Sequence, residues 1–131
     1  MSKDNSQGVV LFGHGARDPR WAEPFEQLAE VLRSQRIANG DTGPVTLAFL
    51  ELMQPDLPSA IAAQADAGCD VVTVVPVFFG RGSHLREDLP ALLAACRAAH
   101  PALEIRCTTA VGEDSTVQAA IASFCLTQIG A

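Results

Sequence analysis

Basic residues are scarce in this chain of 131 residues. Nine lysines and arginines stand against fifteen aspartates and glutamates, which gives a formal net charge of −6. Nucleic acids and anionic membranes are bound by basic surfaces, so the charge argues against both as partners. No apolar run approaches the length of a membrane span, and the opening residues, MSKDNSQ, are polar. We therefore expect a cytoplasmic protein.

Motifs of several common enzyme and metal-binding classes are absent. The chain has no GxGxxG or GxxxxGK[ST] phosphate-binding motif and no GxSxG motif, which argues against a nucleotide cofactor and against a serine hydrolase. Its cysteines form no CxxC pair and have no histidine at zinc-finger spacing. We expect all four to be reduced and buried. They are Cys69, Cys96, Cys107 and Cys125.

The chain does have a regular alternation of short β-like segments and longer helical segments. The pattern βαβαβαβα predicts an α/β fold with a parallel sheet, helices on both faces and the common strand order 2-1-3-4. Nothing divides the chain, so we expect one domain, residues 1–131, with an ordered core from about 8 to 129. The expected strands are 8–13, 45–51, 70–79 and 103–108, and the expected helices are 19–37, 56–68, 88–100 and 114–129.

Finer details of these segments are also predicted. The first three strands are apolar enough to be buried on both faces. Asp56, Asp88 and Asp114 each open a helical segment that they can cap, and prolines follow the first two within the first turn. In the first helix a single apolar stripe is expected to face the sheet; its members are Trp21, Phe25, Leu28 and Leu32.

Two histidines follow the strands that this order places side by side. His14 lies in FGHGARDP after the first strand, and His84 lies in FGRGSHLREDLP after the third. Ligands of such sheets bind outside the carboxyl ends of the strands at this switch point. A lone loop histidine usually forms only local hydrogen bonds, but two at matching positions favour a divalent-metal site or a proton acceptor. Glu51, at the end of the second strand, either joins this site or is a solvated strand-end residue.

Arginines gather in the same two loops of an otherwise acidic chain. A guanidinium pairs with a carboxylate in a fork, so the cluster favours a ligand that carries carboxylates. The alternative is that these arginines balance neighbouring acids such as Asp18, Glu87 and Asp88. Apolar residues near the loops suit a large, flat ligand with an apolar face. The arginines are Arg17, Arg20, Arg81 and Arg86, and the apolar residues are Leu52, Met53, Phe78, Phe79 and Leu85.

Three stretches together resemble the class II chelatases of tetrapyrrole biosynthesis. They are VVLFGHGARDP, ELMQPDLPSAI and VVPVFFGRGSHLREDLP, and the resemblance extends from about Gly8 to Ile129. It is greatest to the small, single-domain sirohydrochlorin cobaltochelatases and their ferrochelatase and nickelochelatase relatives. The resemblance implies a lyase that inserts a divalent metal into an anionic isobacteriochlorin, sirohydrochlorin, in cobalamin or siroheme biosynthesis. It implies no ATP or other nucleotide, and Co²⁺ as the metal, with Fe²⁺ or Ni²⁺ as alternatives.

The resemblance also assigns expected roles to residues. His14 and His84 are expected to hold the metal, and both, with Glu51, to be catalytic. The substrate-binding residues are expected from the arginine cluster rather than from the resemblance; they are Arg17, Arg81 and Arg86, together with Ser83. The arginine at position 81 departs from the small or apolar residue of many relatives. A chain of this size resembles half of a two-domain chelatase and is expected to act as a homodimer. The alternative function is a non-catalytic carrier of metal or tetrapyrrole.

Overall fold

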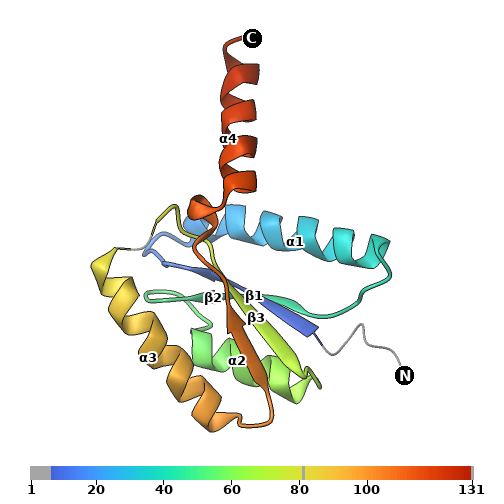
Figure 1. The fold of residues 1–131 in the computed structure, drawn as a ribbon, viewed down its shortest axis with the longest axis vertical. Coiled ribbons are helices and arrows are strands. Elements are labelled where there is room, and N and C mark those ends of the chain that lie inside the picture. The colour runs from blue at the N-terminus through green and yellow to red at the C-terminus, as the bar shows by residue number, and fades with distance from the viewer. Residues whose placement is uncertain (1–6, 81, 131) are drawn as a thin grey trace.

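The computed structural model describes residues 7–80 and 82–130, although not the side chains of residues 83–85, and it contains a four-stranded parallel sheet (Figure 1). The strand order is β2-β1-β3-β4, so the predicted fold class and order are confirmed. Val10 in the central strand β1 pairs with Thr46 in β2 and Val74 in β3. The strands are β1 (Gln7–Gly13), β2 (Val45–Phe49), β3 (Val71–Pro76) and β4 (Glu104–Cys107).

Helices α2 and α3 cover one face of the sheet, α1 lies on the other, and α4 projects away from the sheet (Figure 1). The α-helices are α1 (Glu23–Ala38), α2 (Leu57–Asp66), α3 (Ser83–Ala99) and α4 (Ser115–Gln128). Short 3₁₀-helices, η1 (Pro19–Ala22) and η2 (Val111–Glu113), precede α1 and α4. Within the described chain, no helix is both long and apolar enough to cross a membrane.

The face beneath α2 and α3 holds the larger hydrophobic core. The Asp56 side chain caps α2 by accepting a hydrogen bond from the Ser59 amide at 2.9 Å, and Pro58 lies in the first turn as expected. This cap starts α2 at the register that buries its apolar side against the sheet. The fully buried side chains of this core include Phe12, Leu57, Ile61, Val72, Val74 and Leu89.

The opposite face is only partly covered. Helix α1 packs on β1 and β2, where Leu11, Ala29 and Val45 are buried. The residues of β3 that face this side are only half-buried, so the expectation that β3 is buried on both faces is wrong. Leu28, expected on the buried stripe of α1, is 42% exposed. No described helix lies over β3 and β4 on this face, which leaves the β3 side chains partly exposed (Figure 1).

Helix α3 begins five residues earlier than the sequence predicts. Its N-cap is Gly82, which has no side chain to accept a capping hydrogen bond, so the usual polar start signal is missing. Asp88 is therefore not the cap, and Pro90 lies inside the helix rather than in its first turn. The backbone of His84 consequently lies in the first turn of α3.

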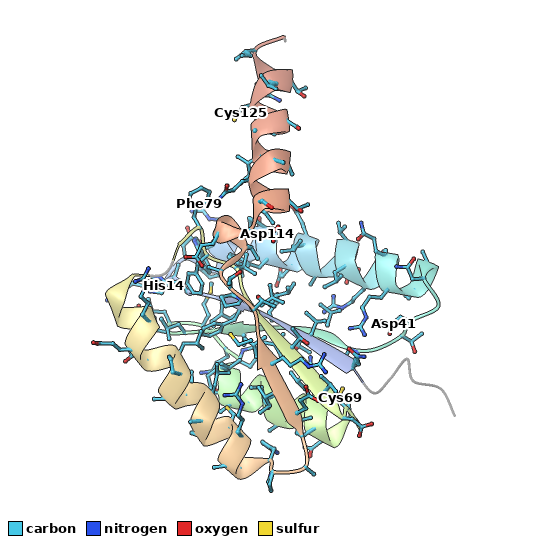
Figure 2. All side chains as sticks on the ribbon, in the orientation of Figure 1. His14, Asp41, Cys69, Phe79, Asp114 and Cys125 are labelled. Atoms are coloured by element: carbon cyan, nitrogen blue, oxygen red, sulfur yellow. The ribbon has the colours of Figure 1, made fainter. Side chains whose placement is uncertain are left out.

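The expectation of four buried cysteines is half right. Cys69 and Cys96 are buried, and burial raises the pKa of both thiols. Cys107 is of intermediate exposure, and Cys125 is exposed because α4 lies away from the sheet (Figure 2). None of the four forms a disulfide within the described chain.

Candidate functional site

The loops after β1 and β2 continue side by side beyond the sheet. The amide of Leu50 donates to the carbonyl of Gly13 at 2.9 Å, and the amide of Glu51 donates to the carbonyl of His14 at 3.1 Å. Backbone hydrogen bonds thus fix where both loops leave the sheet. This carboxyl rim is where ligands of doubly wound sheets bind.

Gly15 allows the close approach of these two loops. Its φ is +97°, a left-handed value that a residue with a side chain rarely adopts. A Cβ at this position would lie 1.8 Å from the carbonyl oxygen of Glu51. Glycine is therefore required here on two independent grounds, and the contact it permits brings Glu51 next to His14.

His14 and Glu51 form a polar pair on the rim. Nε2 of His14 lies 3.3 Å from Oε2 of Glu51, and the two side chains are 54% and 55% exposed. On its other side the imidazole lies against Phe78, with ring centroids 6.3 Å apart. An imidazole and a carboxylate so placed, each still open to solvent, can bind a divalent cation together or pass a proton between them.

The residues predicted from the strand-3 loop lie largely outside the described part of the chain. Arg81 is not described, and neither are the side chains of Ser83 and His84. Whether the His84 imidazole faces His14 therefore stays a prediction. Among the described side chains, no group of three or more His, Cys, Asp or Glu residues forms a metal site.

The loop arginines differ in their surroundings. Arg20 pairs with Asp18 at 2.7 Å, and this hydrogen bonding lowers the pKa of Asp18 and raises that of Arg20. For Arg20 the alternative reading, balance of a neighbouring acid, is therefore the better one. Arg17 forms no ion pair with any described side chain and lies at a cavity, while Arg86 is exposed near the start of α3.

A cavity of about 450 Å³ opens between the loops after β1 and β2 and the start of α1. Leu52 and Met53, the apolar residues predicted near the rim, line it with Arg17. Glu26 and Gln54 also line it, and no sequence signal marked them, because only the folded chain brings the helix start to the loop. An apolar hollow with a cation at its margin suits a ligand with an apolar body and a carboxylate.

Asp56 marks the far end of the loop after β2. Its carboxylate accepts hydrogen bonds from Ser59, and these lower the pKa of Asp56. The amide of Phe49 also donates to the carbonyl of Pro55 at 2.9 Å. Hydrogen bonds thus hold the loop that carries Glu51 at both ends, next to β1 at one end and next to the start of α2 at the other.

The chain matches known proteins over most of its length. The CbiX family model matches residues 8–125. The sirohydrochlorin cobaltochelatase of Methanopyrus kandleri is 38% identical over 85 residues, which are 65% of this chain and 57% of that protein. That of Saccharolobus solfataricus is 35% identical over 86 residues, or 66% and 62% of the two chains. This chain therefore spans less than two thirds of the length of these curated relatives.

Solved structures give the same picture of the fold. A cobalamin (vitamin B12) biosynthesis CbiX protein from Marinobacter aquaeolei has a TM-score of 0.79 and 31% identity, over 95% of this chain and 98% of that one. The sirohydrochlorin chelatase SirB from Bacillus subtilis, in complex with cobalt, has a TM-score of 0.66 and 24% identity. That match covers 83% of this chain and 45% of SirB, and it shows similarity of fold alone.

Proposed function

This chain belongs to the CbiX family, as its motifs predicted, and from that membership we propose that it inserts a divalent metal, Co²⁺ first, into sirohydrochlorin. The observation that carries the proposal is the His14–Glu51 pair at the carboxyl rim, beside an apolar cavity with Arg17 at its margin. The imidazole can bind the metal, the carboxylate can accept a proton, and the apolar cavity with its cation can contact a flat, anionic ring. Fe²⁺ and Ni²⁺ are the alternative metals, because both also accept imidazole ligands.

Insertion requires the protein to hold a partly dehydrated metal ion and to remove two pyrrole N–H protons. The imidazole of His14, when neutral, can bind such an ion without repelling its positive charge. The predicted partner ligand is His84. Glu51, 3.3 Å from the imidazole, is positioned to accept a pyrrole proton, either directly or from His14 after the imidazole has taken that proton. The half-exposed state of both side chains leaves room for a large substrate to approach them.

Carboxylates on the edge of the ring are expected to be bound by cationic side chains around the rim. Arg17 and Arg86 are exposed, and Arg81 and Ser83 are the further predicted contacts. Exposed pairs of this kind contribute on the order of 1 kcal/mol each and weaken with salt. These cationic side chains attract the anionic substrate to a protein that is acidic overall, while the apolar side chains of the rim contact the face of the ring.

We further propose that the chain works as a cytoplasmic homodimer that requires no nucleotide. The match in fold covers 83% of this chain and 45% of SirB, so a second copy would supply a length comparable to the rest of SirB. Large apolar side chains are also exposed at the rim: Leu52 at 59% and Phe79 at 73%. Such side chains suit contact with substrate or with a second subunit.

An anaerobic spectral assay with sirohydrochlorin and each metal in turn tests the function. The expected result is metallation faster than in protein-free solution, fastest with Co²⁺, and loss of that rate in His14→Ala. His100→Ala is the matched control, because His100 lies at the far end of α3 from the rim. A wild-type rate equal to the protein-free rate with every metal would contradict the proposal, whereas stoichiometric binding without turnover would favour a carrier.

A further inference from the structure

The ring of Phe78 lies between the hydrophobic core and His14. It meets the ring of Phe12 edge to face, with centroids 5.9 Å apart and planes at 72°. It also lies against the imidazole of His14, with centroids 6.3 Å apart and planes at 60°. Aromatic rings attract one another at such separations. Because Phe12 is fully buried, Phe78 connects the half-exposed imidazole to the core.

The backbone around Phe78 is held by two neighbouring segments. The amide of Val77 donates to the carbonyl of Phe12 at 2.8 Å, so the chain after β3 still pairs with β1. The carbonyl of Phe78 accepts a hydrogen bond from the amide of Gly112 in η2 at 2.9 Å. A Cβ at Gly112 would collide with the backbone of Phe79, so η2 and this loop are in direct contact. The Phe78 ring therefore extends from a fixed backbone and packs against the larger core.

The imidazole of His14 needs such a support, because its loop fixes only the backbone. The carbonyl of His14 accepts a hydrogen bond from the amide of Glu51, but the side chain can still rotate about two bonds. Two described side chains restrain that rotation: the Glu51 carboxylate, 3.3 Å from Nε2, and the Phe78 ring. The Glu51 side chain is itself 55% exposed, whereas Phe78 is partly buried against the core. Phe78 is therefore the more rigid of the two restraints.

We propose that Phe78 is a positioning residue, whose ring holds the imidazole of His14 in the orientation that binds the metal. This inference rests on the proposed function and adds a residue to its mechanism. The sequence groups Phe78 with the apolar side chains that suit a flat ligand. Its contacts with Phe12 and His14 assign it instead to the support of the site, whereas the adjacent Phe79 is 73% exposed.

The benefit of this support is a side chain that is ordered before the metal arrives. An imidazole that already has the right orientation loses less conformational entropy on binding than one that rotates freely. The rate also depends on geometry, since a misplacement of about 1 Å can lower it about 100-fold. Loss of the Phe78 ring would leave the imidazole present but free to turn. We therefore expect a partial loss of activity, smaller than that of His14→Ala.

Steady-state kinetics of Phe78→Leu separates support of His14 from contact with the substrate. Leucine is apolar but lacks the ring, so kcat is expected to fall about tenfold, while KM for sirohydrochlorin stays within about twofold of the wild-type value. Phe25→Leu is the matched control and should keep the wild-type kcat, because Phe25 also packs edge to face on a phenylalanine, Phe49, but extends from α1. A wild-type kcat in Phe78→Leu, or a raised KM with kcat intact, would overturn the inference.

Binding of Co²⁺ alone tests the same support without turnover. Isothermal titration calorimetry without tetrapyrrole should give a dissociation constant several-fold higher for Phe78→Leu than for the wild type or Phe25→Leu. Equal constants for Phe78→Leu and the wild type would overturn the inference. A wild type that binds Co²⁺ but does not insert it would contradict the proposed function alone, and the three constants would still decide the role of Phe78. A wild type that does not bind Co²⁺ would overturn both.

Nuclear magnetic resonance of the imidazole protons tests the ring contact in solution. The ring current of Phe78 shifts the resonances of nearby protons, so those of His14 should move in Phe78→Leu, while those of His100, at the far end of α3, should not. The spectrum of His14→Ala assigns the signals. Unchanged His14 resonances would overturn the inference. Circular dichroism confirms that each variant folds, and Phe78→Met, which also lacks a ring, replaces Phe78→Leu if the leucine prevents folding; the same losses are expected of it.

Discussion

The sheet body and the carboxyl rim of this domain are held in different ways. In the body, side chains such as Phe12, Ile61 and Val72 are fully buried and pack against one another. On the rim, His14 and Glu51 are each about half exposed, and backbone hydrogen bonds and the space left at Gly15 determine their position. Rim side chains can therefore be replaced with little effect on folding, whereas body side chains cannot. From this contrast we expect substitutions on the rim to change activity and substitutions in the body to change stability.

His14→Ala is the largest expected effect on activity. Removing the imidazole removes the proposed metal ligand and the partner of Glu51, so we expect the metal-insertion rate to fall at least about 100-fold. The melting temperature should hardly change, because the side chain is 54% exposed and contributes little to the core. Thermal unfolding and the anaerobic spectral assay measure the two effects on one preparation. A large drop in melting temperature would contradict the proposal that rim side chains contribute little to the stability of the fold.

Ile61→Ala should show the opposite behaviour. Ile61 is fully buried under α2, and its truncation is expected to lower the free energy of unfolding by about 2–5 kcal/mol. Ile121→Ala is the matched control, since Ile121 is an isoleucine in a helix that the domain leaves exposed. In protein dilute enough to be monomeric, its effect should stay within about 0.5 kcal/mol. Urea denaturation measures both, and similar losses would show that α4 is buried within its own domain.

Glu51→Gln should have an intermediate effect on activity. The amide keeps the shape of the side chain but cannot accept a proton, so we expect the rate of insertion to fall roughly tenfold. The imidazole of His14, the proposed metal ligand, stays in place, so the expected loss is smaller than in His14→Ala. An unchanged rate would return Glu51 to the reading of a solvated loop residue.

The smallest effect is expected for Arg81→Ala. Loss of the proposed contact to a substrate carboxylate, on the order of 1 kcal/mol, should raise KM several-fold at low ionic strength and leave kcat nearly unchanged. The difference from wild type should narrow as salt screens the interaction. Steady-state kinetics at two salt concentrations measures this. Loss of kcat with KM intact would assign Arg81 to the chemical step.

Much of the fold could be predicted because local signals agree with it. The segment pattern predicted the sheet, and the caps Asp56 and Asp114 correctly marked the starts of α2 and α4. The start of α3 could not be predicted, because its cap, Gly82, has no polar side chain, whereas Asp88 and Pro90 imitate a later start. Local sequence thus identified helices well where a capping side chain was present.

The burial of elements was harder to predict than their existence. The apolar residues of α4 and Leu28 of α1 predict contact with a hydrophobic surface, but a single sequence does not say which chain supplies it. For the same reason β3 was expected to be buried on both faces. On the rim, the motifs brought His14 and Glu51 to attention, yet their 3.3 Å contact depends on Gly15, whose role is visible only in the folded chain.

The most direct measurement counts the metallated product formed per subunit, without oxygen, when sirohydrochlorin and Co²⁺ are both in large excess. If this domain is a chelatase, the product should exceed one equivalent per subunit many times over. Under the same conditions His14→Ala should form no more product than protein-free solution. Product that stops at one equivalent, or a His14→Ala variant that turns over like the wild type, would contradict the account.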